Sequence, residues 1–290
     1  MEFWLGTAFT GTEELVPLAR AADASGYHAI AVPDRLFFAE YKSVHPYTES
    51  GVPAFTSQAH WPDPWVAIGA MAALTQRLRL ATKIYVAPAR DLFTVAKAVS
   101  TAAVLSQGRV VFGAGAGWCA DEFGQTGQDF RTRNRRLDEM IPALRALWQG
   151  GETEFHGDFY DFGPLAICPV PSAPVPVYLG GDSESALERA ARLGDGWIGA
   201  RAYTEDQLED VLEILTRHLA AHGRTLDDLT VMAPIASRPS AALYQKWEER
   251  GVNATQALPW AMAPRDGDGS GTDHKIASME RFAEDVIAKM

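Results

Sequence analysis

The sequence predicts a single α/β domain folded as a (β/α)8 barrel, that is, a TIM barrel. Strand-like and helix-like segments alternate along all 290 residues, and eight of each can be placed. No shift in composition, repeat or low-complexity tract marks a linker, so we expect residues 1–290 to form one domain. Such alternation fits a closed barrel or an open, doubly wound sheet, and eight units in a chain of this length favour the barrel.

Eight segments are predicted as strands, and each leads toward a helix. They are residues 3–9, 28–32, 78–86, 109–112, 175–179, 197–200, 229–235 and 252–258. In a barrel the functional site lies at the C-terminal ends of the strands, so the residues that follow each strand are where a site is expected.

The helices are predicted from apolar stripes and capping residues. Asp63 followed by Pro64 is an N-terminal signal, and Thr204 with Gln207 forms a capping box. The clearest helix is the fourth, in which apolar residues fall at offsets 0, 3, 4, 7, 10 and 11 from Leu137. The predicted helices span residues 12–25, 65–75, 91–105, 132–148, 183–193, 204–222, 241–249 and 278–290.

Two long segments show no period. Residues 34–62 form a loop rich in Phe, Tyr, His, Pro and Ser, and residues 150–175 form an aromatic, proline-rich excursion. A structureless loop of about thirty residues inside a compact domain is usually functional. We therefore expect the 34–62 loop to cover a site.

Composition limits the kinds of partner. The formal net charge of −11 argues against a general nucleic-acid or anionic-membrane surface, and no window approaches the ~18 apolar residues of a membrane span. Two cysteines cannot make a disulfide framework, which suggests the cytoplasm. His218 and His222 lie four apart on a predicted helix without the glutamate of a His-Glu-x-x-His zinc motif, and no metal is expected.

The run Gly113-Ala-Gly-Ala-Gly117 brings bare backbone to the end of the fourth strand. Packing within the protein is not expected to require three glycines at alternate positions. We therefore expect a large flat ligand to lie against this backbone. Gly115, Gly117 and Ala120 also match a dinucleotide fingerprint. That alternative requires the first strand of a βαβ unit, an immediate helix and a later acidic residue, and none of the three is met.

A candidate anion site follows the fifth strand. In Gly180-Gly-Asp-Ser183, two glycines lead into a serine-capped helix, so unpaired N–H groups and the positive end of the helix dipole meet at one place. The alternative is an ordinary strand-to-helix turn. Arginines 131, 133, 135 and 136 could add positive charge or form a solvated helix face.

The chain resembles the luciferase-like flavin and deazaflavin oxidoreductases, and most closely their coenzyme F420 branch. The matching motifs run in family order over roughly residues 3–200. They are Asp63-Pro-Trp-Val-Ala-Ile-Gly, Arg77-Leu-Arg-Leu-Ala-Thr-Lys-Ile84, Leu105-Ser-Gln-Gly-Arg-Val110, Gly113-Ala-Gly-Ala-Gly-Trp118, Glu122-Phe123, Arg133 with Arg136 and Glu139, Leu147-Trp148, Gly180-Gly181 with Ser183, and Gly194-Asp-Gly-Trp197.

This resemblance implies a (β/α)8 barrel, often dimeric, that binds F420. It implies a ring resting on the end of the third strand, where a non-prolyl cis peptide joins Lys83 to Ile84. The cofactor-binding residues implied are Asp34, Lys83, Ile84, Gly115, Ala116 and Gly117, with Gly180, Gly181 and Ser183 holding the phosphate. Arg131 or Arg133 would meet the acidic tail of the deazaflavin.

Two positions depart from the pattern of the family's sugar-phosphate dehydrogenases. Arg35 stands where those enzymes have a catalytic histidine, and Trp118 stands where they have a catalytic glutamate. The departures indicate a different substrate. Arg90-Asp91-Leu92 replaces a common Arg-His-Pro, which concerns only the start of a helix.

The expected function is hydride transfer between F420 and a small organic substrate under the 34–62 loop. The cofactor carries such chemistry, and the protein supplies placement, a dry pocket and a proton donor. Candidate donors are His45, His60, Tyr85 and Glu122; candidate pocket walls are Phe37, Phe38, Trp61 and Trp118. The alternatives are an FMN-dependent monooxygenase and a barrel that binds cofactor without turnover.

Overall fold

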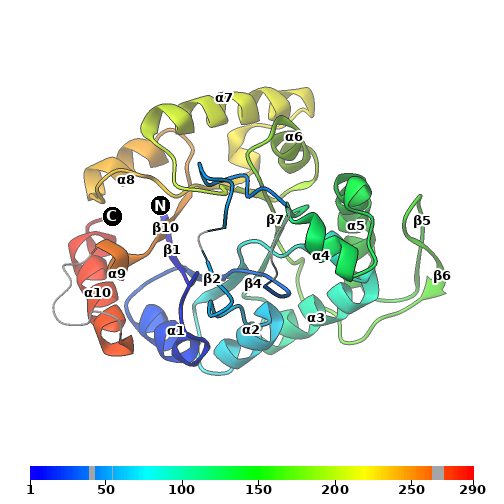
Figure 1. Ribbon diagram of the computed structural model, residues 1–290, viewed down its shortest axis with the longest axis horizontal. Coiled ribbons are helices and arrows are strands. Elements are labelled where there is room, and N and C mark those ends of the chain that lie inside the picture. Colours follow the sequence, from blue (N-terminus) through cyan, green and yellow to red (C-terminus); the bar gives the residue numbers. More distant parts are fainter. Residues whose placement is uncertain (39–42, 54, 263–270) are drawn as a thin grey trace.

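The computed structural model is a closed parallel barrel and describes residues 1–38, 43–53, 55–262 and 271–290. Its strand order is β1-β10-β9-β8-β7-β4-β3-β2 (Figure 1). The strands are β1 (Glu2–Gly6), β2 (Ala29–Val32), β3 (Arg79–Thr82), β4 (Val110–Ala114), β7 (Val177–Gly180), β8 (Gly196–Ile198), β9 (Thr230–Met232) and β10 (Ala254–Ala257). The predicted barrel is confirmed, and the open sheet is excluded.

Side chains alternate between the inside and the outside of the barrel, as strand geometry requires. Trp4 points inward while Phe3 and Leu5 point outward, and Val111 points inward while its neighbours join the outer layer. The inner core consists of Trp4, Ala29, Ala31, Ala81, Val111, Tyr178, Ile198, Met232 and Ala254. Four of these nine residues are alanines, and the two large rings, Trp4 and Tyr178, stack on one another.

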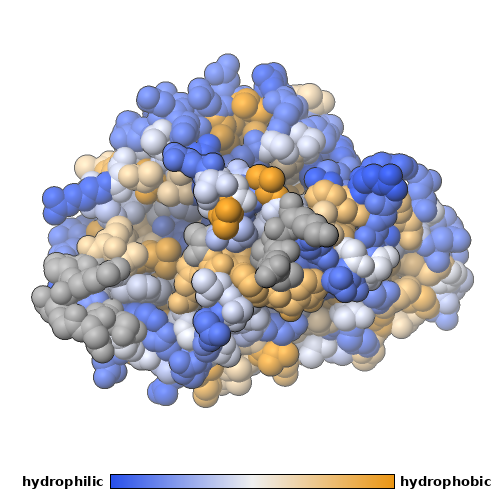
Figure 2. All heavy atoms as spheres, in the orientation of Figure 1, coloured by the Kyte–Doolittle hydropathy of each residue, from blue (hydrophilic) through white to orange (hydrophobic). Residues whose placement is uncertain are grey.

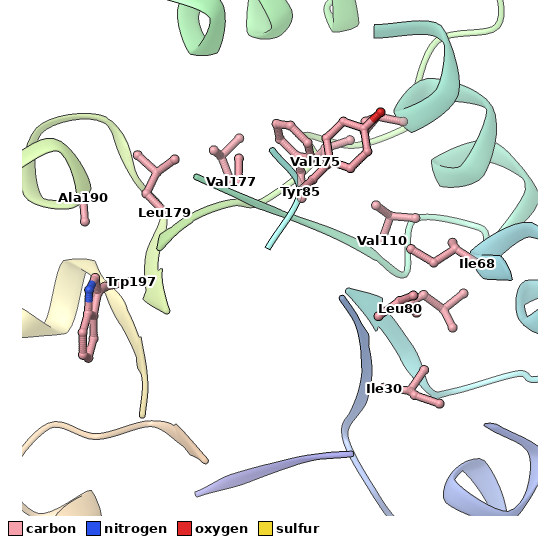
Figure 3. Close-up of a cluster of buried hydrophobic side chains, with 14 of the residues drawn as sticks. Ile30, Ile68, Leu80, Tyr85, Val110, Val175, Val177, Leu179, Ala190 and Trp197 are labelled. Atoms are coloured by element: carbon pink, nitrogen blue, oxygen red, sulfur yellow. The ribbon is translucent and has the colours of Figure 1, made fainter. Parts of the chain in front are cut away.

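Helices surround the barrel and bury its outer face. The main ones are α1 (Leu15–Ala24), α2 (Pro64–Ala72), α3 (Leu92–Leu105), α5 (Arg133–Trp148), α6 (Glu184–Leu193), α7 (Glu205–Ala221), α8 (Ala241–Glu248) and α10 (Thr272–Asp285). Figure 3 shows strand residues such as Leu80 and Val110 beside Ile68 of α2 in the layer between barrel and helices. This outer layer is the larger of the two cores.

The capping residues act as predicted. The Asp63 carboxylate accepts hydrogen bonds from the N–H groups of Trp65 and Val66, and Ser183 caps α6. Thr204 and Gln207 form the expected reciprocal pair. The departure at Arg90-Asp91-Leu92 does not disturb its helix, because Asp91 caps α3 through the Thr94 N–H.

Several boundaries differ from the sequence-based prediction. The third strand was expected to reach residue 86 but ends at Thr82; Tyr85, further along the chain, makes an isolated bridge to Ala114. The last helix begins at Thr272 rather than at 278. Sequence reasoning also missed short α4 (Ala120–Gln125) and α9 (Pro259–Met262).

The 150–175 excursion contains a hairpin that its sequence did not reveal. Strands β5 (Thr153–His156) and β6 (Asp161–Leu165) pair antiparallel outside the barrel (Figure 1). The hairpin is held by tertiary contacts, since Glu139 of α5 accepts the N–H groups of residues 158–160 and Phe162 packs against Phe93. No helix within the described ranges is long and apolar enough to cross a bilayer.

Two glycines should respond oppositely to replacement by alanine. A Cβ on Gly113 would lie 1.9 Å from the Thr82 carbonyl oxygen on the neighbouring strand, so Gly113→Ala must displace backbone and should lower the free energy of unfolding by about 3 kcal/mol. A Cβ on Gly69, inside α2, meets nothing within 4 Å, and Gly69→Ala should raise that free energy by about 0.5–1 kcal/mol. Urea unfolding measures both; equal effects would contradict the assigned strand packing.

Candidate active site

Two glycine-rich strand ends lie side by side at the barrel opening. β4 pairs with β7, with Ala114 opposite Leu179, and an ideal Cβ on Gly115 would lie 3.8 Å from the Gly180 carbonyl oxygen. Because all barrel strands are parallel, their C-terminal ends share one rim. The two motifs singled out in the sequence therefore belong to one place in the structure.

The glycines of this rim are in contact with the side chains of Ile84 and Val86. A Cβ on Gly115 would lie 1.9 Å from Ile84 Cδ1, and one on Gly180 would lie 2.7 Å from Ile84 Cγ2. A Cβ on Gly117 would similarly meet Val86 Cγ1 at 2.5 Å. The expectation that packing could not explain these glycines was wrong. Their missing side chains make room for Ile84 and Val86, which the sequence pattern could not show.

Ile84 is held above the inner core of the barrel. The Lys83–Ile84 peptide is cis, as the resemblance implied. On its far side, the Tyr85 N–H donates to the Gly113 carbonyl at 2.7 Å and the Gly115 N–H donates to the Tyr85 carbonyl at 3.0 Å. Ile84 is half-buried and packs against the inner core cluster, so it offers an apolar surface at the barrel opening.

The N-terminus of α6 offers unpaired donors next to this surface. Within the described part of the chain, the N–H groups of residues 182–185 form no hydrogen bond. Gly181 has a φ of 125°, a conformation that favours glycine. The Asp182 carboxylate is already engaged, since it accepts from the Ala200 N–H, Arg201 Nε and the Tyr203 hydroxyl.

Asp34 fixes the segment that follows the third strand. Its carboxylate accepts two hydrogen bonds from Arg90, at 2.7 and 2.8 Å, and a third from the Val86 N–H at 2.8 Å. Burial raises the pKa of Asp34, and the Arg90 guanidinium and the Val86 N–H oppose this rise. The residue therefore ties the start of the 34–62 loop to the segment that carries Ile84.

The two departures from the family pattern contact one another. The Arg35 guanidinium lies 4.7 Å from the centre of the Trp118 ring and donates to the Glu122 carboxylate at 3.1 Å. Glu122 also accepts the Leu36 N–H at 3.0 Å. Both charged side chains are nearly fully buried, and burial raises the pKa of Glu122 while Arg35 opposes that rise.

Aromatic residues of the 34–62 loop gather near this ion pair. Phe55 packs against Phe38 and Trp61, and Phe9, in the turn after β1, contacts both Phe55 and Trp61. The loop passes across the barrel opening in Figure 1, and hydrophobic residues surround it in Figure 2. Phe37, also predicted as a wall residue, is half-buried. Residues 39–42 and 54 of this loop lie outside the described residues.

Only two of the four candidate proton donors, His45 and Glu122, lie near one another. His45 packs on Trp118, with its pKa lowered by burial and by Arg35, and Glu122 lies nearby in its ion pair. His60 instead accepts the Thr12 N–H at the start of the first helical segment. Tyr85 is buried between Trp65 and Phe112, and burial raises its pKa.

A cavity of about 390 Å³ opens among the ends of β1, β2, β3, β8, β9 and β10. Its polar lining includes Lys83, Arg201 and Gln256, which sequence reasoning did not bring together as a pocket. The available signal was their position directly after or at the end of predicted strands. Ile84, Gly115 and Gly180 are not among its lining residues, whereas Lys83, the neighbour of Ile84, is.

The predicted arginine cluster and the two helix histidines contact residues close to them in the structure. Arg133 donates to the Gly117 carbonyl at 3.0 Å and lies over the Phe130 ring, whereas Arg131 is exposed and pairs with Asp129. His218 and His222 contact Glu184 and Glu188, respectively. Across the described ranges, no three His, Cys, Asp or Glu side chains are grouped to hold a metal.

Removing Glu122 should test the buried ion pair. Glu122→Ala leaves the Arg35 guanidinium without its buried carboxylate, and the free energy of unfolding should fall by about 3 kcal/mol. Glu209→Ala, which removes a half-exposed partner of Arg250, is the control and should leave that energy nearly unchanged. The free energy of unfolding of both variants is measured by urea titration. Equal losses of that energy would contradict the assigned buried ion pair.

Comparison with known proteins agrees with this geometry. Residues 4–271 match the family model described as luciferase-like monooxygenase. The uncharacterized protein Rv0940c of Mycobacterium tuberculosis is 32% identical over 303 residues, covering 100% of both chains. An F420-dependent glucose-6-phosphate dehydrogenase of Nakamurella multipartita is 30% identical over 281 residues, covering 95% of this chain and 76% of the relative.

A solved structure shares the fold. The F420-dependent secondary alcohol dehydrogenase in complex with an F420-acetone adduct superposes with a TM-score of 0.77 at 16% identity, covering 100% of this chain and 99% of the other. That identity is low enough that the likeness concerns the fold alone. The family match covers most of the chain and includes both glycine-rich strand ends. The chain therefore belongs to the luciferase-like monooxygenase family.

Proposed function

We propose that this protein is an oxidoreductase that transfers a hydride between coenzyme F420 and a small organic substrate beneath the 34–62 loop. The observation that carries the proposal is the apolar side chain of Ile84, seated against Gly115 and Gly180 at the barrel opening. The relative that is named as F420-dependent and spans 95% of this chain supports the choice of cofactor.

The residues at this rim fit a deazaflavin with a phosphate. The apolar face of Ile84 suits an aromatic ring, and the half-buried residues Ala116 and Gly117 continue the chain from Gly115, which contacts it. The free N–H groups after Gly181, together with Ser183, suit a phosphate. In this proposal Gly115, Gly180 and Asp34 act by holding Ile84 and Val86 in place, and Arg133 borders the same rim.

Bound F420 would donate or accept the hydride at C5 of its ring. The protein's own part is to place the reactants and exclude water. The aromatic residues of the 34–62 loop would form the apolar wall, and the Arg35, Glu122 and Trp118 contacts hold the start of that loop down. Since Arg35 and Trp118 stand where the resemblance places the catalytic histidine and glutamate of sugar-phosphate dehydrogenases, we do not expect the substrate to be a sugar phosphate.

Cofactor choice is tested by titrating the purified protein with F420 and with FMN while following the fluorescence of each. We expect saturable F420 binding, and FMN binding at least about tenfold weaker. Tight binding of FMN alone, with oxygen consumed on reduction, would replace this proposal by the flavin-dependent monooxygenase that the family description favours.

The role of Ile84 is tested by truncation. Ile84→Ala should weaken F420 binding at least about tenfold, because the ring loses its apolar support. Ile214→Ala, which shortens a partly buried isoleucine of α7 in the outer layer, is the matched control and should leave binding unchanged. Unchanged binding by the Ile84 variant would mean that the ring lies elsewhere.

A further inference from the structure

We infer that Lys83 is the catalytic residue that exchanges a proton with the substrate, giving it to a carbonyl oxygen in reduction and taking it from a hydroxyl group in oxidation. The inference rests on the proposed hydride transfer and deepens it, because it names the proton donor and the class of substrate. Lys83 was not among the candidate donors expected from the sequence.

The Lys83 ammonium lies at the part of the rim where Ile84 is seated. It donates to the Gly199 carbonyl at 3.1 Å. Gly199 directly follows Ile198, which pairs in register with Gly180, the glycine that makes room for the Ile84 side chain. The ammonium is therefore held next to the strand ends that support Ile84, beside the proposed position of the ring.

Lys83 also lines the cavity of about 390 Å³ and has donors to spare. An ammonium carries three N–H donors, and within the described ranges Lys83 forms no hydrogen bond other than the one to Gly199. A carbonyl oxygen of a substrate in the cavity would accept one of the remaining N–H groups. That contact is the geometry that proton transfer requires.

The other titratable residues in the described lining of the cavity are unsuited to proton transfer near neutral pH. They are Arg201 and Tyr244. A guanidinium stays protonated in proteins, and burial raises the pKa of Tyr244 to about 12. Removal from water lowers the pKa of Lys83 to about 8, against the opposing charge of Asp182. A group with a pKa near the working pH serves as both acid and base.

The other charged and titratable groups around Lys83 belong to the neighbouring strand ends and to the 34–62 loop. Asp182, whose charge acts on Lys83, pairs with Arg201 and accepts the Tyr203 hydroxyl. Its charge also acts on Tyr47, and burial raises the pKa of both phenols. With these phenols neutral and Asp182 paired, Lys83 is the group of this set that gains or loses its charge near pH 8.

The proton and electrons balance in both directions. In reduction, the carbonyl carbon of the substrate gains the hydride with its two electrons, the π bond to oxygen breaks, and the oxygen takes a proton from the Lys83 ammonium. The product is an alcohol, and the neutral amine regains a proton from water. Oxidation runs the same steps backward. A carbonyl compound is the fitting class because hydride addition puts negative charge on an oxygen, which an ammonium stabilises.

The ionisation of Lys83 is measured without cofactor or substrate. The full-length protein, labelled with ¹³C in its lysine side chains, is titrated by NMR, and the signal lost in both Lys83→Met and Lys83→Arg belongs to Lys83. We expect this signal to titrate near pH 8, below the ordinary lysine value of about 10.4. Titration at the ordinary value would overturn the inference, because the amine would then be too scarce near neutral pH to act as a base.

Hydride transfer is measured with cyclohexanone and benzaldehyde in the presence of reduced F420, and with cyclohexanol and benzyl alcohol in the presence of oxidised F420. The two directions should respond oppositely to pH, because reduction needs the ammonium and oxidation needs the amine. We expect reduction to slow above a pH of about 8 and oxidation to slow below it. Profiles without this mirrored inflection would contradict the inference, and this measurement needs no variant.

Two variants separate proton transfer from charge. Lys83→Met should slow both directions at least about 100-fold and remove the inflection, while F420 affinity, followed by fluorescence, stays within about twofold of wild type. Lys83→Arg should be equally slow, because a guanidinium keeps the positive charge but does not release its proton. Lys289→Met, which removes an exposed lysine near the C-terminus, is the control and should match wild type. Full activity of Lys83→Arg would overturn the inference by making Lys83 a point charge.

The outcomes also separate this inference from the function on which it rests. Failure of F420 to bind would overturn the proposed function, and the inference would fall with it. Binding of F420 without turnover of any carbonyl or alcohol probe would overturn the inference alone.

Discussion

The seating of Ile84 on the bare backbone of Gly115 and Gly180 is the contact on which the barrel opening depends. Each glycine lacks the Cβ that would collide with Ile84, so the residue after the cis peptide turns over the inner core. Below it, the small residues of the inner core let two large rings fill the barrel. Above it, the Asp34 carboxylate holds Val86 and Arg90, which fixes the same segment from the loop side.

A second network ties the 34–62 loop to the region after β4. Arg35 bridges Trp118 and Glu122 within a nearly dry environment, where a charge is tolerated only because its partner is equally buried. The positions at which this chain departs from its sugar-phosphate relatives thus form one structural unit. In this unit the Arg35 guanidinium and the Glu122 carboxylate hold the start of the loop against the residues that follow β4.

Lys83 and Ile84 are adjacent residues with opposite surroundings. Ile84 meets the glycine-rich rim, whereas Lys83 lines a cavity bounded by strands from the other side of the barrel. One short segment therefore separates an apolar surface from a charged one.

The amino-acid sequence by itself determined the alternation of strands and helices, the capping residues at Asp63, Ser183 and Thr204, and the family motifs that located the Lys83–Ile84 peptide. These features are local, because periodicity and capping depend on residues a few positions apart. Only the tertiary structure decided that the glycines accommodate Ile84, that Arg35 meets Glu122 across 87 positions, and that Lys83, Arg201 and Gln256 line one cavity. Those contacts depend on how eight strands close and in which register, which no local pattern encodes.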